Sequence, residues 1–154
     1  MIDVKIRTLA TFDPNLGLPK YETLGSAGAD IKANLTASKT LELLPGQKEL
    51  IPTGLSVEIP SGYEIQVRPR SGLSFKTGLM VVNSPGTIDS DYRGELKIIL
   101  ANMGDKTELI KHGDRVAQII LAPVIQARFI EVNELTETTR GQGGFGSTGV
   151  SLEG

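Results

Sequence analysis

Residues 89–93 place two carboxylates, an aromatic ring and a guanidinium group in one short connection between apolar runs. A carboxylate such as Asp89, held beside a backbone ribbon, could take a proton from a water molecule. Tyr92 offers a flat apolar face with a polar tip, which is a common platform for a sugar or a base. For such a stretch taken alone, an Asp-rich surface turn without a chemical role is the more common case. The other segments of the chain must therefore decide between a surface turn and a functional site.

A second candidate lies at residues 69–73 (PRSGL), where one strand is expected to end and a short helix to begin. The hydroxyl of Ser71, the charge of Arg70 and the bare backbone of Gly72 would meet at a helix amino terminus. Unpaired N–H groups point outward there and bind anions. The alternative, equally weighted on these residues, is an ordinary helix cap in which Ser71 bonds its own backbone.

Two further segments carry one polar group each among small or apolar residues. Gln118 interrupts an apolar run, so it is either a satisfied core amide or a donor that faces a ligand. Asp30 follows the small residues 25–29 and either lies near the water shell of a metal or belongs to a simple turn. On spacing alone, the structural alternative leads in both cases.

The carboxyl-terminal segment is polar and aperiodic from residue 133 onward, and residues 140–149 (RGQGGFGSTG) are rich in glycine. Such a segment cannot bury enough apolar area to order itself, and many glycine-rich termini are simply disordered. The functional alternative is a lid that folds over a ligand. Arg140 would supply charge, Phe145 would stack on a base, and glycine N–H groups would approach phosphate oxygens.

The elements that must position these groups are short strands. Apolar residues alternate with polar ones in several runs, for example at Leu55, Val57 and Ile59, and turn residues bound each run. The run at residues 116–121 is nearly continuous, as expected for a strand buried on both faces. One short helix is expected near residues 71–77. The pattern predicts an all-β sandwich or jelly roll in a single domain of residues 1–132, followed by a tail at 133–154.

Composition excludes several classes of function. The chain has 154 residues, a net charge of -2, no cysteine and one histidine. Duplex nucleic acid is therefore an unexpected partner, and disulfide, thiolate, histidine–zinc and Ser/His/Asp chemistry are excluded. No signal peptide or membrane-spanning run is visible, so we expect a cytoplasmic protein. Magnesium stays open, because it takes oxygen ligands mainly from phosphates and water.

Five segments stand out in chain order: residues 27–31 (AGADI), 69–73 (PRSGL), 86–94 (GTIDSDYRG), 113–118 (GDRVAQ) and 140–149 (RGQGGFGSTG). Taken together, they resemble the trimeric deoxyuridine triphosphatases (dUTPases) over nearly the whole chain. The departures are small: Ala29 stands where members often carry a larger apolar residue, and Thr77 stands where many carry histidine. Neither residue touches the chemistry.

The resemblance implies a distorted jelly-roll subunit, a homotrimer with active sites shared between subunits, Mg²⁺, and hydrolysis of dUTP to dUMP and pyrophosphate. Asp89 would activate the attacking water, and Asp30 would contact the metal through water. The residues implied for phosphate are Arg70, Ser71, Gly72, Gln118, Arg140, Ser147 and Thr148; those for uracil and deoxyribose are Asn83, Gly86, Thr87, Ile88, Tyr92 and Phe145. Two alternatives remain: a dCTP deaminase of the same superfold and a non-catalytic nucleotide-sensing trimer.

Overall fold

The computed structural model describes residues 2–144 of the chain. This part folds mainly into antiparallel strands, with one short α-helix and one turn of 3-10 helix, so the all-β expectation is confirmed. The elements in chain order are β1 (Lys5–Thr8), η1 (Pro14–Leu16), β2 (Ala29–Lys32), β3 (Thr40–Leu43), β4 (Lys48–Glu58), β5 (Tyr63–Arg68), α1 (Ser71–Lys76), β6 (Leu79–Val81), β7 (Gly86–Ile88), β8 (Glu95–Asn102), β9 (Glu108–Lys111) and β10 (Arg115–Pro123).

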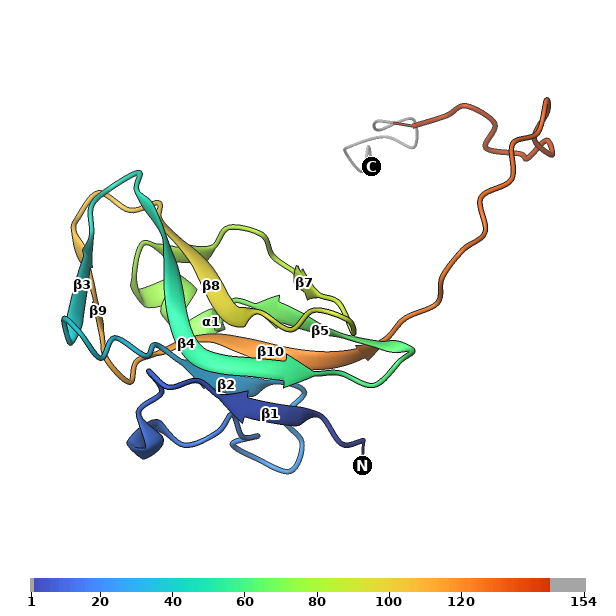
Figure 1. The fold of residues 1–154 in the computed structure, drawn as a ribbon. Coiled ribbons are helices and arrows are strands. Elements are labelled where there is room, and N and C mark those ends of the chain that lie inside the picture. Colours follow the sequence, from blue (N-terminus) through green and yellow to red (C-terminus); the bar gives the residue numbers. More distant parts are fainter. Residues whose placement is uncertain (1, 145–154) are drawn as a thin grey trace.

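Two four-stranded sheets form the body of this distorted jelly roll (Figure 1). One sheet has the strand order β1-β4-β8-β6 and the other β2-β10-β5-β7, while β3 and β9 pair separately. Neighbours in the sheets are mostly distant in sequence. As a result, β10, the last strand, lies between β2 and β5 and brings its residues beside two much earlier segments.

The core lies between the two sheets and follows the alternation seen in the sequence. In β5, for example, Ile65 and Val67 are buried while the residues between and beside them are more exposed. Burial of one such side chain contributes about 2 kcal/mol. In β10 the expectation of burial on both faces holds for Val116 and Ala117, but Ile120 and Leu121 are only half-buried. The outer end of this strand is therefore less enclosed than its apolar sequence predicts.

Strand β4 runs through a position where the sequence indicates a turn. Thr53 and Gly54 do not separate two elements; they form an irregularity within one strand, where pairing with β8 breaks between Pro52 and Ser56. Gly54 adopts φ +70°, which favours glycine, and its N–H donates to Oε1 of Glu95 at 2.8 Å. The strand continues past this irregularity, and its residues 55–58 pair with β1 on the other edge.

The sequence of residues 81–95, with its Ser-Pro-Gly turn between apolar runs, predicts an irregular hairpin, and the structure adds a crossing between sheets to it. Strands β6 and β8 do pair, with Val81 opposite Leu100. Between them, however, β7 joins the other sheet by pairing with β5, so that Gly86 lies opposite Val67. The connection thus crosses from one sheet to the other and back, which the local sequence pattern does not reveal.

Beyond Pro123 the chain leaves the sheets, and residues 124–144 contain no helix or strand (Figure 1). Large apolar side chains in this stretch are exposed, with Ile125 at 96%, Phe129 at 94% and Leu135 at 86%. Regular structure therefore ends before residue 132, where we expect the domain to end; that boundary stays a prediction. Within residues 2–144, no helix has the length and apolar character needed to cross a membrane.

Candidate active site

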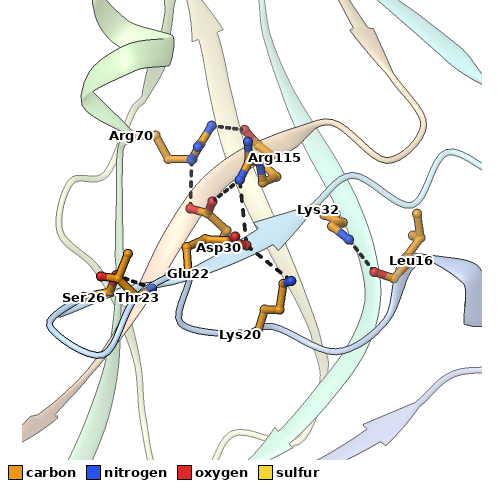
Figure 2. A network of polar contacts seen from close by, with 9 residues as sticks. All are labelled: Leu16, Lys20, Glu22, Thr23, Ser26, Asp30, Lys32, Arg70 and Arg115. Carbon is orange, nitrogen blue, oxygen red and sulfur yellow. Dashed lines mark hydrogen bonds and ion pairs between the residues drawn. The ribbon is translucent and has the colours of Figure 1, made fainter.

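Asp30 is the centre of a charged network that three elements build (Figure 2). In β2, Ala29 and Ile31 point into the core, so the intervening Asp30 faces away from it. Oδ1 of Asp30 accepts a hydrogen bond from Nε of Arg70 at 2.8 Å, and Oδ2 accepts one from Nη1 of Arg115 at 3.2 Å. Nη1 of Arg70 also donates to the backbone carbonyl of Arg115 at 3.3 Å.

Gln118 lies beside this network because β10 pairs with both β2 and β5. Its register partners are Asp30 on one side and Arg68 on the other. Nε2 of Gln118 donates to the backbone carbonyl of Pro69 at 2.9 Å, which ties the amide to the loop before α1. This half-buried amide is therefore neither a fully enclosed core group nor a free donor: it is oriented at the edge of a cavity.

The amino terminus of α1 forms another wall of the same cavity. Arg70 is the cap residue and makes no side-chain cap hydrogen bond, while Ser71 is the first helical residue. Ser71 therefore does not cap the helix in this structure. Gly72 is open, with nothing within 4 Å of the position that a Cβ would occupy.

These segments enclose a cavity of about 430 Å³. It gathers residues from three of the segments that the sequence singles out, and its charges are two arginines and two carboxylates. A cavity with oriented cations and a helix amino terminus is suited to a polyanion such as a phosphate chain. The lining residues are Glu22, Ser26, Ala27, Gly28, Asp30, Arg70, Ser71, Gly72, Arg115 and Gln118.

Asp89 lies elsewhere, on the connection that follows β7. It is exposed and borders two cavities, one of about 410 Å³ that also contacts Thr87, Ile88 and Tyr92, and one of about 530 Å³ that also contacts Asp91. Asp89 is thus shared by both cavities, whereas Asp91 borders only the larger one. The first cavity thus combines apolar side chains, an aromatic ring and a carboxylate, a mixture that suits a small-molecule site.

The positions of Tyr92 and Asn83 depend on two glycines. The Tyr92 hydroxyl donates to the backbone carbonyl of Glu95 at 3.0 Å, and its ring covers Gly94, where a Cβ would collide with it. A Cβ on the buried Gly86 would lie 2.9 Å from Nδ2 of Asn83. Both glycines therefore permit a close approach that a larger residue would disturb.

Within one chain, the two groups of predicted residues remain apart. The cavity around Asp30 and the cavities around Asp89 share no lining residue. Arg140 borders none of them; it lies on the exposed tail, where its Nε donates to the carbonyl of Gly143 at 2.9 Å. Phe145, Ser147 and Thr148 lie outside the described residues.

The sequence pattern misses two cavity residues, Arg115 and Glu22. Arg115 belongs to a segment that is singled out for Gln118, and its position next to a strand start is the signal that could have identified it. His112, the single histidine, lies in the turn after β9, but its side chain is only 14% exposed and its Nε2 lies 3.0 Å from Oδ2 of Asp13. Nδ1 of His112 is buried without a hydrogen-bond partner among the described residues.

Comparisons with known proteins identify the family. The dUTPase family model matches residues 15–149. The deoxyuridine 5'-triphosphate nucleotidohydrolase of Chlamydia pneumoniae is 59% identical over 135 residues, which cover 87% of this chain and 92% of that protein. The protein of the same name from Brucella melitensis biotype 2 is 56% identical over 136 residues, which cover 88% of this chain and 87% of that protein.

Solved structures agree with these matches. A mutant dUTPase of Staphylococcus bacteriophage 80alpha with dUpNHpp is 28% identical, has a TM-score of 0.80, and is matched over 96% of this chain and 99% of that one. A mutant dUTPase from phage phi11 of S. aureus, described with a structural Mg(II) ion, is 26% identical with a TM-score of 0.72. The match covers 86% of this chain and 97% of that one. Sequence and fold lead to the same conclusion: the chain belongs to the dUTPase family.

Proposed function

We propose that the chain hydrolyses dUTP to dUMP and pyrophosphate. The observation that carries this proposal is the cavity in which Arg70, Ser71, Gly72 and Gln118 meet, because these residues come from separate segments and would together bind a phosphate chain. Membership of the dUTPase family supports the identity of the nucleotide. The names of the relatives describe the same reaction class.

Phosphate recognition in this proposal uses charge and oriented donors. Arg70, Ser71 and Gly72 line the cavity, so the Arg70 guanidinium, the Ser71 hydroxyl and the first backbone N–H groups of α1 would bind phosphate oxygens. From the tail, Arg140, Ser147 and Thr148 would close over the outer phosphates. Charge-assisted hydrogen bonds are about twice as strong as neutral ones, so Arg70 and Arg140 would contribute most.

Base and sugar recognition uses the connection around β7. Backbone groups near Asn83, Gly86, Thr87 and Ile88 would pair with the uracil edge, whose donor and acceptors are reversed in cytosine. A mismatched base would leave buried polar groups unpaired, and such sites discriminate by roughly 10⁴. Tyr92 would pack against C2′ and exclude a ribose hydroxyl, and Phe145 would stack over the base.

Asp89 would perform the proton transfer. Its carboxylate accepts a proton from a water molecule whose oxygen forms a bond to the α-phosphorus, while the bond from that phosphorus to the bridging oxygen of pyrophosphate breaks. Such a positioned base gives about 10² to 10⁴ in rate. The remaining acceleration must come from alignment and from neutralisation of charge.

A homotrimer with shared sites would bring the separated groups together. Asp89 and Arg70 line different cavities in one chain, and the tail extends away from the sheets (Figure 1). A site composed of one chain's β7 connection, a neighbour's phosphate cavity and a tail from a third chain would contain every predicted residue. The exposed apolar side chains at Ile125 and Phe129 fit burial against another copy.

Magnesium fits this cavity only as an ion that the substrate largely coordinates. Within residues 2–144, no group of three or more His, Cys, Asp or Glu side chains could hold a metal. Both oxygens of Asp30 already accept hydrogen bonds from arginines, so its contact to a metal would run through water. When bound, Mg²⁺ would neutralise phosphate charge.

Product analysis with dUTP, dCTP, dTTP and UTP side by side tests the proposal. We expect pyrophosphate and dUMP from dUTP in the presence of Mg²⁺, and little turnover of the other three. Ammonia released from dCTP would instead indicate a deaminase, and tight dUTP binding without pyrophosphate would indicate a nucleotide sensor. The cytoplasmic location expected from the sequence stays a prediction.

A further inference from the structure

The carboxylate of Asp30 is divided between two guanidinium groups. Its side chain is 13% exposed, and each oxygen accepts from a different arginine: Oδ1 from Arg70 and Oδ2 from Arg115. The two arginines would repel each other if no anion lay between them. Asp30 therefore sets the position of both cations at once, and its loss would affect both.

Arg115 is placed to contact a ligand of this cavity. It is the first residue of β10, at an irregularity in the pairing with β2, and its side chain remains 45% exposed. A guanidinium group carries several N–H donors in a planar fork. The ion pairs of Arg115 with Asp30 and Glu22 both use Nη1, so Nε and Nη2 can serve a further anion in the cavity that Arg115 lines.

Glu22 lies on the open side of Arg115. Its Oε1 is 3.8 Å from Nη1 of Arg115 and 4.0 Å from Nζ of Lys20, both beyond hydrogen-bond length (Figure 2). The Glu22 side chain is 43% exposed, so water screens these pairs. This carboxylate is thus a weakly held anion at the place where a phosphate group would approach Arg115.

We propose that Arg115 is a further phosphate-binding residue, that Asp30 is the positioning residue for Arg70 and Arg115 together, and that the incoming polyphosphate displaces Glu22. The inference rests on the proposed function and deepens it. In this inference Asp30 acts by holding the two arginines in place and not by contacting a metal ion. Displacement of Glu22 changes the local charge from two cations and two anions to an excess of one cation, which matches a polyanionic ligand.

Binding of inorganic tripolyphosphate, measured by calorimetry, tests the role of Arg115. We expect Arg115→Ala to weaken binding about tenfold, because one charge-assisted contact is lost. The affinity of Arg115→Lys for tripolyphosphate should lie between those of wild type and Arg115→Ala. An ammonium group keeps the charge, but it cannot contact Asp30 and the ligand together as a planar guanidinium does. In dUTP turnover, the effect should appear mainly in KM. Arg7→Ala, an exposed arginine of β1, is the control.

Glu22→Gln tests displacement without removing a cation. We expect tripolyphosphate to bind about threefold more tightly, because no carboxylate competes for Arg115. The matched control is Glu58→Gln, which removes a carboxylate that pairs with Lys5 at 2.6 Å far from the cavity and should change nothing. Weaker binding in Glu22→Gln would show that Glu22 supports the site and would overturn the displacement.

Asp30→Asn separates positioning from a metal role. We expect about tenfold weaker tripolyphosphate binding both with Mg²⁺ and in EDTA, since both arginines lose their anchor. A loss confined to the magnesium samples would assign Asp30 to the metal and overturn the proposal. Thermal melting checks folding, and Arg115→Lys and Glu22→Gln carry the test if Asp30→Asn does not fold.

The outcomes also separate this inference from the proposed function. If the wild-type chain hydrolyses dUTP but Arg115→Ala binds tripolyphosphate normally, the inference is wrong and the function stands. If wild-type protein leaves dUTP intact while Arg115→Ala still weakens tripolyphosphate binding, the function is wrong and the phosphate site stands.

Discussion

A Cβ atom on Gly28 would lie 2.5 Å from Oε1 of Gln118, so the absence of a side chain at residue 28 creates the space that the glutamine amide occupies. The same amide donates from Nε2 to the carbonyl of Pro69 at 2.9 Å. The loop before β2 and the loop before α1 therefore position Gln118 from opposite sides. These contacts link three of the segments that distinguish the sequence, at residues 27–31, 69–73 and 113–118.

Gly28→Ala should impair phosphate binding more than folding. The closest atom is the end of a flexible side chain, so the Gln118 amide can rotate away, while Cβ of Gln118, at 3.2 Å, requires a shift of a few tenths of an ångström. The fold survives this shift, but the amide leaves its place in the cavity. We expect KM for dUTP to rise about tenfold, the effect of one lost polar contact, with a shift in Tm of only a few degrees. Steady-state kinetics and thermal melting measure the two effects.

The control for Gly28→Ala is Gly25→Ala in the same loop. Nothing lies within 4 Å of the Cβ position there, so both kinetics and melting should stay near the wild-type values. A normal KM in Gly28→Ala would mean that Gln118 does not contact substrate from its observed position.

Asp89→Asn should keep nucleotide binding and lower kcat by at least about 10², because an amide cannot accept the proton from water. Binding of a non-hydrolysable dUTP analogue and single-turnover hydrolysis separate the two effects. Asp91→Asn is the matched control, since Asp91 lies in the same turn but borders only the larger cavity. Near-normal turnover in Asp89→Asn, with a loss in Asp91→Asn, would reassign the base.

If three chains share their active sites as proposed, mixed assemblies should recover activity from two inactive parents. Chains with Asp89→Asn lack the base, and chains truncated before Arg140 lack the tail; reassembly from both would create some sites with every group intact. We expect turnover well above the sum of the separate parents after unfolding and refolding together. No recovery in trimers shown by mass spectrometry to be mixed would contradict sites built from several chains.

Asp13 should contribute to stability in a pH-dependent way. The backbone N–H of Asn15 donates to Oδ1 at 2.9 Å and His112 contacts Oδ2, and these hydrogen bonds hold the pKa of Asp13 below its ordinary value of 3.8. A lowered pKa stabilises the folded state above pH 3.8, and the contribution is lost as pH falls through the lower folded-state pKa.

Asp13→Asn should therefore lower the free energy of unfolding at neutral pH and reduce its decline below pH 3.8. Urea unfolding at a series of pH values measures this difference. Asp105→Asn replaces an exposed carboxylate in the turn after β8 and serves as the control. Parallel pH profiles for wild type and Asp13→Asn would show that the ionisation of Asp13 does not couple to folding.

Much of the local structure follows from the sequence, because short-range preferences decide it. Alternation at Ile65 and Val67 predicts a strand with one buried face, and the glycine-bounded stretch after Pro69 predicts the short helix that the structure has. The single histidine and the lack of cysteine exclude whole classes of chemistry. The order of the five segments is also a property of the sequence alone, and it leads to the family.

Tertiary structure decided which of these segments meet. Asp30, Arg70 and Arg115 are far apart in sequence and come into contact only because β10 pairs with β2 while the chain enters α1 from β5. In the same way, His112 contacts Asp13, and β7 joins the sheet opposite to β6 and β8. The physical reason is that a period of two specifies which face of a strand is buried but not which strand lies beside it; strand pairing depends on packing of the whole core.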